Sequence, residues 1–194
     1  MRCWRPHGNC WRAGLRSWGN IARRIRVPLG FAFAIFYLWL ARPTWESLVL
    51  GAAICVPGLA LRALASGHVQ KNTCLTTTGP YAYTRNPLYL GSLVLAGGFA
   101  VAARSLWIAL AIVALFLLVY LPVVGAEEEF LRLRFPEFAE YAQQVPRFLP
   151  RWRPAEARAD RFSSQLYWKH REYNALAGTG AMMAALAIKM VWFR

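Results

Sequence analysis

Apolar residues gather into five long runs along the chain, and polar or charged residues concentrate between them. The runs are Val27–Ala41, Trp45–Ala65, Pro87–Ala103, Leu106–Ala126 and Ala175–Phe193. A helix needs about 20 mainly apolar residues to cross the hydrocarbon core of a bilayer. The first four runs come close to that length, and the fifth is weaker because it contains Lys189. We expect that lysine to reach the interface from a helix end. The pattern predicts an all-α integral membrane protein of about five transmembrane helices.

The composition agrees with this prediction. Of the 194 residues, 57% are hydrophobic and only 16% are charged, whereas soluble domains contain roughly a quarter charged residues. No internal repeat divides the chain. We therefore expect a basic extension over residues 1–26 and a single membrane domain over residues 27–194, whose last span covers about residues 175–193.

The charges predict an orientation in the membrane. Lys and Arg number 23 against 9 Asp and Glu, a formal net charge of +14. The tail before residue 27 holds seven arginines, and the segment from Arg132 to Arg171 holds nine basic residues. Because basic residues favour cytoplasmic loops, the N-terminus is predicted to be cytosolic and the C-terminus to lie across the membrane. We expect the basic tail to contact membrane lipids rather than nucleic acid.

The cysteines and histidines predict no metal site. Cys3, Cys10, Cys55 and Cys74 have no zinc-ligand spacing, and Cys55 falls within an apolar run. His68 and His170 are far apart in the sequence and have no neighbouring ligands, which favours structural or surface roles.

Two polar segments fall on the predicted cytosolic side, Ser66–Asn86 and the segment that begins at Ala126. Arg85 precedes the third span, and Glu127 follows the fourth span 42 residues later. Two antiparallel spans return the chain to the face that it left. Arg85 and Glu127 are therefore expected at the same depth, and close together.

Glu127, Glu128 and Glu129 are consecutive, so on a helix they point about 100° apart. At least one is expected to face the bundle; the alternative is a solvated acidic turn offset by Arg132 and Arg134. The segment from Gly79 to Tyr83 is interpreted either as a turn with interfacial aromatic residues or as a lid over a nucleoside. Asn86–Pro87 is a typical helix start.

The segment Gly79-Pro-Tyr-Ala-Tyr-Thr-Arg85-Asn-Pro-Leu-Tyr89-Leu-Gly91 resembles the GPYxxxRHPxYxG signature of the isoprenylcysteine carboxyl methyltransferases, which the phospholipid N-methyltransferases share. Glu127-Glu128-x-x-Leu131-x-x-x-Phe135 resembles the EExxLxxxF block that follows in these families. The resemblance covers about residues 60–150, the motif core of the domain.

The resemblance implies an S-adenosylmethionine-dependent methyltransferase whose cofactor pocket opens on the cytosolic face. Its acceptor would be a lipophilic molecule from the bilayer, either isoprenylcysteine-like or another lipid. The catalytic candidates are Arg85, Asn86 and Glu127. The implied cofactor-binding residues are Gln70, Thr73, Cys74, Leu75, Thr76, Tyr81, Asn86, Pro87, Leu88, Tyr89 and Glu127.

Two departures from the pattern leave the acceptor open. Asn86 stands where the family has histidine, so no titratable group is present there. Val123 stands where eukaryotic carboxyl methyltransferases place a substrate-binding arginine. Two other functions remain as alternatives, an NADPH-dependent sterol-type reductase of similar fold and a non-enzymatic membrane scaffold.

Overall fold

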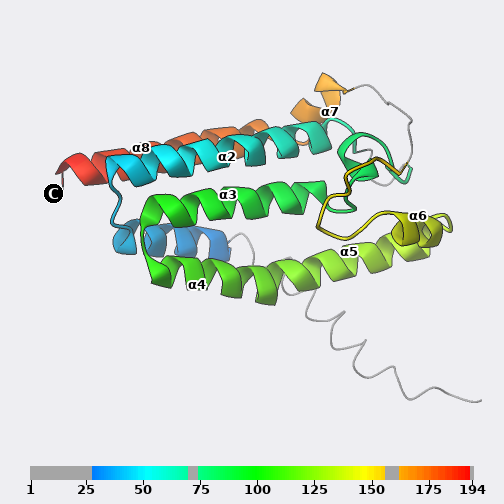
Figure 1. Ribbon diagram of the computed structural model, residues 1–194, viewed down its shortest axis with the longest axis horizontal. Coiled ribbons are helices and arrows are strands. Elements are labelled where there is room, and N and C mark those ends of the chain that lie inside the picture. Colours follow the sequence, from blue (N-terminus) through cyan, green and yellow to red (C-terminus); the bar gives the residue numbers. More distant parts are fainter. Residues whose placement is uncertain (1–27, 70–73, 156–161, 193–194) are drawn as a thin grey trace, which may run out of the picture.

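The computed structural model describes residues 28–69, 74–155 and 162–192. These residues form helices and connecting segments, with no strand among them (Figure 1). The predicted basic extension over residues 1–26 lies outside the described residues, and so do Gln70 and Thr73. The predicted all-α class is confirmed for the part of the chain that is described.

Each predicted span corresponds to an apolar helix. The helices are Pro28–Leu40, α2 (Trp45–Ser66), α3 (Pro87–Ala103), Leu106–Arg134 and α8 (Tyr173–Trp192). By length and composition, α2, Leu106–Arg134 and α8 are able to cross a membrane, while the other two are shorter. The 17 residues of α3 extend about 25 Å at the usual helical rise. Three of the five predicted spans therefore have membrane-spanning length.

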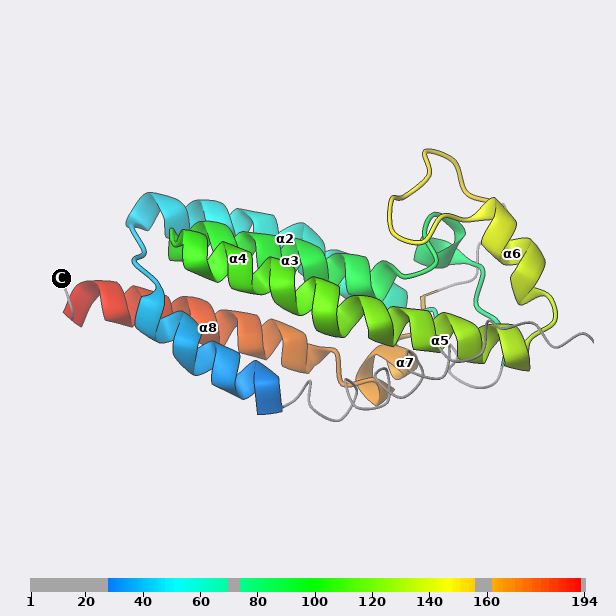
Figure 2. The ribbon, with the colours of Figure 1, turned by 90° about the horizontal axis from the view of Figure 1, so that it is seen from below.

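The helix that begins at Leu106 is longer than predicted. It consists of α4 (Leu106–Leu115), the π-helical turn η2 (Phe116–Tyr120) and α5 (Leu121–Arg134). The apolar run ends at Ala126, but no helix-breaking residue follows until Pro136. Phe135, directly before that proline, is extended, as sterics require. As a result α5 projects beyond the bundle and carries the short helix α6 (Phe138–Gln144) there (Figures 1 and 2).

The π-helical turn ends at Tyr120, two residues before Pro122. Proline has no backbone N–H to donate to the preceding turn, and its ring crowds that turn. A wider turn relieves this crowding, and such turns are frequent at functional sites. By contrast, α2 remains α-helical through Pro57.

Glycines allow α2 and α3 to approach closely. A Cβ atom on Gly98 would lie 2.7 Å from the carbonyl oxygen of Gly51 and 2.5 Å from the sulfur of Cys55. Farther along the pair, a Cβ atom on Gly58 would lie 2.9 Å from the carbonyl oxygen of Gly91. A Cβ on Gly97 would meet nothing within 4 Å. Of the two adjacent glycines predicted to admit a neighbouring helix, Gly98 faces α2 and Gly97 does not.

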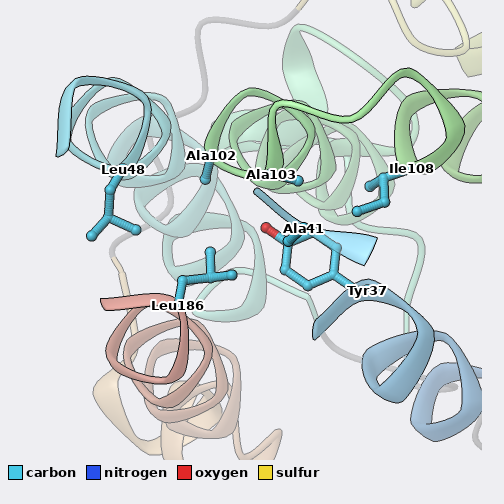
Figure 3. Packing of buried hydrophobic residues seen from close by; sticks show 7 residues of the cluster. All are labelled: Tyr37, Ala41, Leu48, Ala102, Ala103, Ile108 and Leu186. Carbon is cyan, nitrogen blue, oxygen red and sulfur yellow. The ribbon is translucent and has the colours of Figure 1, made fainter. Parts of the chain in front are cut away.

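An apolar cluster closes the end of the bundle where α3 turns into α4 (Figure 3). Its buried members are Tyr37, Ala41, Leu48, Ala102, Ala103, Ile108 and Leu186. The phenol of Tyr37 donates a hydrogen bond of 2.9 Å to the carbonyl of Phe99. This cluster joins five helices at the end opposite the 3-10 turn η1 (Gly79–Ala82) and α7 (Ser164–Lys169) (Figure 1).

Lys189 has hydrogen-bond partners that the sequence did not predict. Its ammonium group donates hydrogen bonds to the carbonyls of Trp39, at 3.0 Å, and Ala41, at 2.8 Å. It also donates to the carbonyl of Leu38. These carbonyls lie at the C-terminal end of the helix Pro28–Leu40, where helical carbonyls lack backbone partners and a cation is favoured. Lys189 therefore caps a neighbouring helix.

We expect Lys189→Met to lower the free energy of unfolding by about 1–2 kcal/mol, because capped carbonyls lose their donor in an apolar surrounding. Thermal unfolding in detergent would measure this loss. The matched control is Lys169→Met in α7, where the lysine is exposed and has no described hydrogen bond. Equal transition temperatures for the two variants would contradict the capping role.

Candidate active site

The two polar segments singled out in the sequence lie against each other at the end of the bundle that carries η1. The amide of Arg85 donates to the carbonyl of Pro146 at 2.9 Å, and the hydroxyl of Thr84 donates to the carbonyl of Arg147 at 3.2 Å. Further along, the amide of Ala155 donates to the carbonyl of Ala82 at 3.0 Å. Residues 82–85, directly before α3, are therefore held by the chain that follows α6.

Glu128 is the carboxylate at the centre of this contact. Its Oε1 accepts a hydrogen bond of 2.9 Å from Nδ2 of Asn86, and its Oε2 lies 2.9 Å from Nη2 of Arg147. Nε of Arg85 lies 3.7 Å from Oε1. The Glu128 side chain is only 13% exposed. One nearly buried carboxylate thus joins α5, the start of α3 and the loop after α6.

Arg85, which was expected close to Glu127, contacts the run of glutamates through Glu128. Arg85 forms its ion pair with Glu128, the next residue along α5. Consecutive helical residues point about 100° apart, so Glu127 is directed elsewhere. Nε of Arg85 is buried and has no hydrogen-bond partner among the described residues. A buried donor of this kind is costly unless a further group satisfies it.

Glu127 lies near enough to Tyr81, in η1, for its charge to affect the phenol. Burial, followed by the charges of neighbours that include Tyr141, Glu127 and Glu172, raises the pKa of Tyr81 well above its usual value. The phenol is therefore a neutral hydrogen-bonding group at physiological pH. The backbone of Tyr81 is fixed as well, because the hydroxyl of Tyr141 donates 2.8 Å to its carbonyl.

Tyr89 connects this group to the membrane-embedded part of the protein. It is among the neighbours that raise the pKa of Tyr81. Its ring packs edge-on against Tyr120, with centroids 6.1 Å apart. Tyr89 therefore joins the first turn of α3 to the helix that contains η2.

The remaining predicted cofactor-binding residues occupy varied positions. Cys74 is exposed and Thr76 is half-buried. Leu75 packs against the small apolar cluster of Phe138, Tyr141 and Val145. Pro87 is buried as the first residue of α3, and the carbonyl of Leu88 accepts a hydrogen bond from Arg62. The structure thus places Asn86 in the Glu128 cluster and Tyr89 against Tyr120. The charge of Glu127 reaches the phenol of Tyr81.

Sequence reasoning missed Arg62, Arg147 and Glu172. Arg62 and Glu172 form an ion pair across 110 residues, with 2.8 Å between Nη2 and Oε2. A signal for Arg62 was present, because a lone arginine inside an apolar run is expensive and needs a partner. A signal for Arg147 was present too, because Val145-Pro146-Arg147-Phe148 resembles the usual ending of the family's second block. For Glu172, which stands in a polar segment, no comparable signal exists.

An apolar cavity of about 150 Å³ lies between the helix Pro28–Leu40, α3 and the segment around η2. Its lining includes Leu29, Phe33, Ser92, Phe116, Val119 and Tyr120. Tyr120, which contacts Tyr89, and Ser92, which binds Arg62, connect it to the polar groups. Val119 and the buried Val123 pack with Tyr89 in one apolar cluster. An apolar chamber therefore adjoins the polar site.

Together, the apolar helices and this site define the class as an integral membrane protein with a polar site at one end of its helical bundle. The sequence pattern of the phospholipid methyltransferase family matches residues 29–137, more than half of the chain. The chain belongs to this family, which indicates methyltransferase activity and confirms the family resemblance noted in the sequence.

Two curated relatives carry other names. The chain is 39% identical over 135 residues to the cobalt-zinc-cadmium resistance protein CzcN of Cupriavidus metallidurans, covering 65% of this chain and 62% of that protein. It is 35% identical over 114 residues to the nickel-cobalt-cadmium resistance protein NccN of Alcaligenes xylosoxydans xylosoxydans, covering 58% and 53%. The chain thus spans little more than half the length of these relatives. No solved structure matches it.

Proposed function

We propose that the protein is an S-adenosylmethionine-dependent methyltransferase that acts on a lipophilic acceptor drawn from the bilayer. The observation that carries this proposal is the hydrogen bond of 2.9 Å from Asn86 to Glu128, which joins the two blocks of the family signature near an apolar chamber. These residues lie in separate parts of the chain, and membership of the family supports their common use.

The residues of the site suit the cofactor. Glu127 is a carboxylate for an ammonium group or for ribose hydroxyls, and the unsatisfied Nε of Arg85 is a donor for a carboxylate. Aromatic faces such as those of Tyr81 and Tyr89 attract a cation such as a sulfonium. When bound, the cofactor supplies an electrophilic methyl group and departs as a neutral thioether. The protein's part is to align the acceptor and to exclude water.

The charges near the site favour an amine over a carboxylate as the acceptor group. Val123, at the position of a carboxylate-binding arginine in related enzymes, is buried among apolar side chains. Arg62 and Arg147 already pair with carboxylates, and the donor of Arg85 is assigned to the cofactor. Glu127 and the two phenols are better partners for a neutral amine, whose lone pair attacks the methyl group, and for the positively charged product than for an anion. We therefore propose a lipid amine whose hydrocarbon chain occupies the apolar cavity.

The membrane orientation and the physiological setting belong to the same proposal. We place the site on the cytosolic side, because the basic segments beside it favour that side of the membrane. The names of the two relatives suggest a setting of resistance to cobalt, nickel, zinc or cadmium. Within the described ranges, no group of three or more His, Cys, Asp or Glu side chains is arranged to hold a metal ion. We therefore propose methylation of a membrane component as the contribution to that setting.

Calorimetric titration of S-adenosylhomocysteine into detergent-purified protein tests the cofactor. We expect micromolar-range binding by the wild type and at least a tenfold loss in Glu127→Gln, because a charged partner of the ligand is removed. Glu140→Gln in α6, an exposed position, is the matched control and should bind like the wild type. Absence of binding by folded wild-type protein would overturn the proposal, and NADPH would then be titrated to test the reductase alternative.

The acceptor is tested with membrane lipids and methyl-labelled cofactor. The extracted lipids are treated with alkali. Label that alkali does not release as methanol indicates an N-methyl product, which we expect. Label released as methanol indicates a methyl ester and would contradict the amine assignment while leaving the methyltransferase assignment intact.

A further inference from the structure

Arg62 connects three parts of the molecule. It belongs to the last turns of α2, and its Nη1 donates to the hydroxyl of Ser92 and lies 3.5 Å from the carbonyl of Leu88. Both acceptors belong to the first turns of α3. Its other nitrogens bind the carboxylate of Glu172: Nε lies 3.1 Å from Oε2, and Nη2 lies 2.9 Å from Oε1.

Glu172 is itself held in place. It directly precedes α8, and the residue before it, Arg171, has a left-handed backbone with φ of 54°. Non-glycine residues adopt that conformation at a cost, so the surrounding structure must favour it. The Glu172 side chain is 12% exposed and the Arg62 side chain 22%. Two charges that are mostly removed from water in a bidentate geometry form a strongly directional contact.

The segment that carries Glu172 is fastened to the end of α2 at several points. The amide of Ser163 donates 3.0 Å to the carbonyl of Gly67, and Nδ1 of His170 lies 3.1 Å from the carbonyl of Ser66. Phe162 covers Gly67 so closely that a Cβ atom there would lie 2.2 Å from its ring. These contacts give Glu172 a defined position beside Arg62.

The position of Glu172 matters because the first turn of α3 belongs to the proposed site. Asn86 occupies the N-cap position of α3, and Tyr89 lies in its first turn. Arg62 donates hydrogen bonds to this turn, at the carbonyl of Leu88, and to the next turn, at the hydroxyl of Ser92. The charge of Glu172 also reaches the phenol of Tyr81, whose pKa it helps to raise. The pair is thus linked to both aromatic residues of the proposed cofactor site.

We infer that Arg62 and Glu172 are a positioning pair for the methyl-transfer site: Arg62 holds the first turns of α3, and Glu172 holds Arg62 in that pose. This inference rests on the proposed function. It assigns a role in the site to the segment of residues 162–173, which follows the family-matched region of residues 29–137. Neither residue touches the reacting atoms in this assignment.

The test compares three full-length variants in detergent. Glu172→Gln removes the charge that orients Arg62, and Arg62→Lys keeps a cation for Glu172 but loses the contacts with α3. Lys189→Met is the matched control, because it weakens the bundle at the opposite end. Well below every unfolding transition, we expect at least tenfold weaker S-adenosylhomocysteine binding in the first two variants and unchanged binding in the third. Wild-type affinity in Glu172→Gln, or an equal loss in Lys189→Met, would overturn the inference.

Hydrogen exchange of the ligand-free protein separates this inference from the proposed function. We expect the amides of residues 88–93 to exchange faster in Glu172→Gln and Arg62→Lys than in the wild type or Lys189→Met. If the wild type does not bind S-adenosylhomocysteine, the proposed function fails while this measurement still decides the positioning role. Unchanged exchange in both variants would overturn the inference.

Discussion

Replacing Gly98 by leucine should separate α2 from α3, with the largest loss of stability of any change considered for this protein. The position has no room even for a methyl group, since a Cβ would lie 2.5 Å from the sulfur of Cys55 and 2.7 Å from the backbone of Gly51. Backbone atoms cannot move aside as a flexible side chain does. We therefore expect a loss at or above the upper end of the roughly 1–3 kcal/mol typical of overpacking. Thermal unfolding in detergent would show it.

Gly97→Leu is a closely matched control, because it adds the same side chain one residue away. A Cβ at that position meets nothing within 4 Å, so we expect a transition temperature close to that of the wild type. Gly98→Ala should fall between the wild type and Gly98→Leu. A similar stability for the two leucine variants would show that α2 and α3 do not pack through Gly98.

Glu128→Gln should produce the second largest effect. The change leaves Arg85 and Arg147 without their shared counter-charge, although the amide still accepts from Asn86. Removing one partner of a buried ion pair costs about 3–5 kcal/mol. Arg147 is 41% exposed, so solvent screens part of this loss and we expect about 2–3 kcal/mol. Loss of the contact should also release the loop after α6, and proteolysis near residues 145–155 would detect this.

The control for this change is Glu140→Gln, which removes the same charge from an exposed position on α6. We expect it to change the stability by less than about 0.5 kcal/mol, as surface substitutions usually do. If Glu128→Gln has the same unfolding temperature and the same rate of proteolysis as Glu140→Gln, Glu128 does not hold the loop after α6.

The helices were largely predictable from the sequence because their signals are local. The start of α3 at Pro87 followed from the pair Asn86–Pro87, and its end at Ala103 followed from the end of the apolar run. The end of α5 at Arg134 was not predicted. Hydropathy reports where the bilayer ends, whereas a helix continues until a residue such as Pro136 stops it.

The site was predictable only in part, since its contacts depend on relationships between distant segments. The hairpin argument correctly brought Arg85 to the depth of the glutamates, but choosing between Glu127 and Glu128 required the rotation of α5 about its axis. The pairs Arg62–Glu172 and Arg147–Glu128 join single charges that follow no periodic pattern. The prediction for Lys189 considered only the helix that contains it, whereas its hydrogen-bond partners lie at the end of another helix.

The π-helical turn sets that rotation. Such a turn contains one more residue than the α-helical turn that it replaces, within about the same rotation. If Phe116–Tyr120 were α-helical instead, every residue downstream would be turned by about 100°, and Glu127 would take the direction that Glu128 has now. Deleting one residue from this turn would restore an α-helical turn and leave Glu128 facing Arg85. The extra residue in this apolar helix therefore determines which of the three consecutive glutamates faces the site.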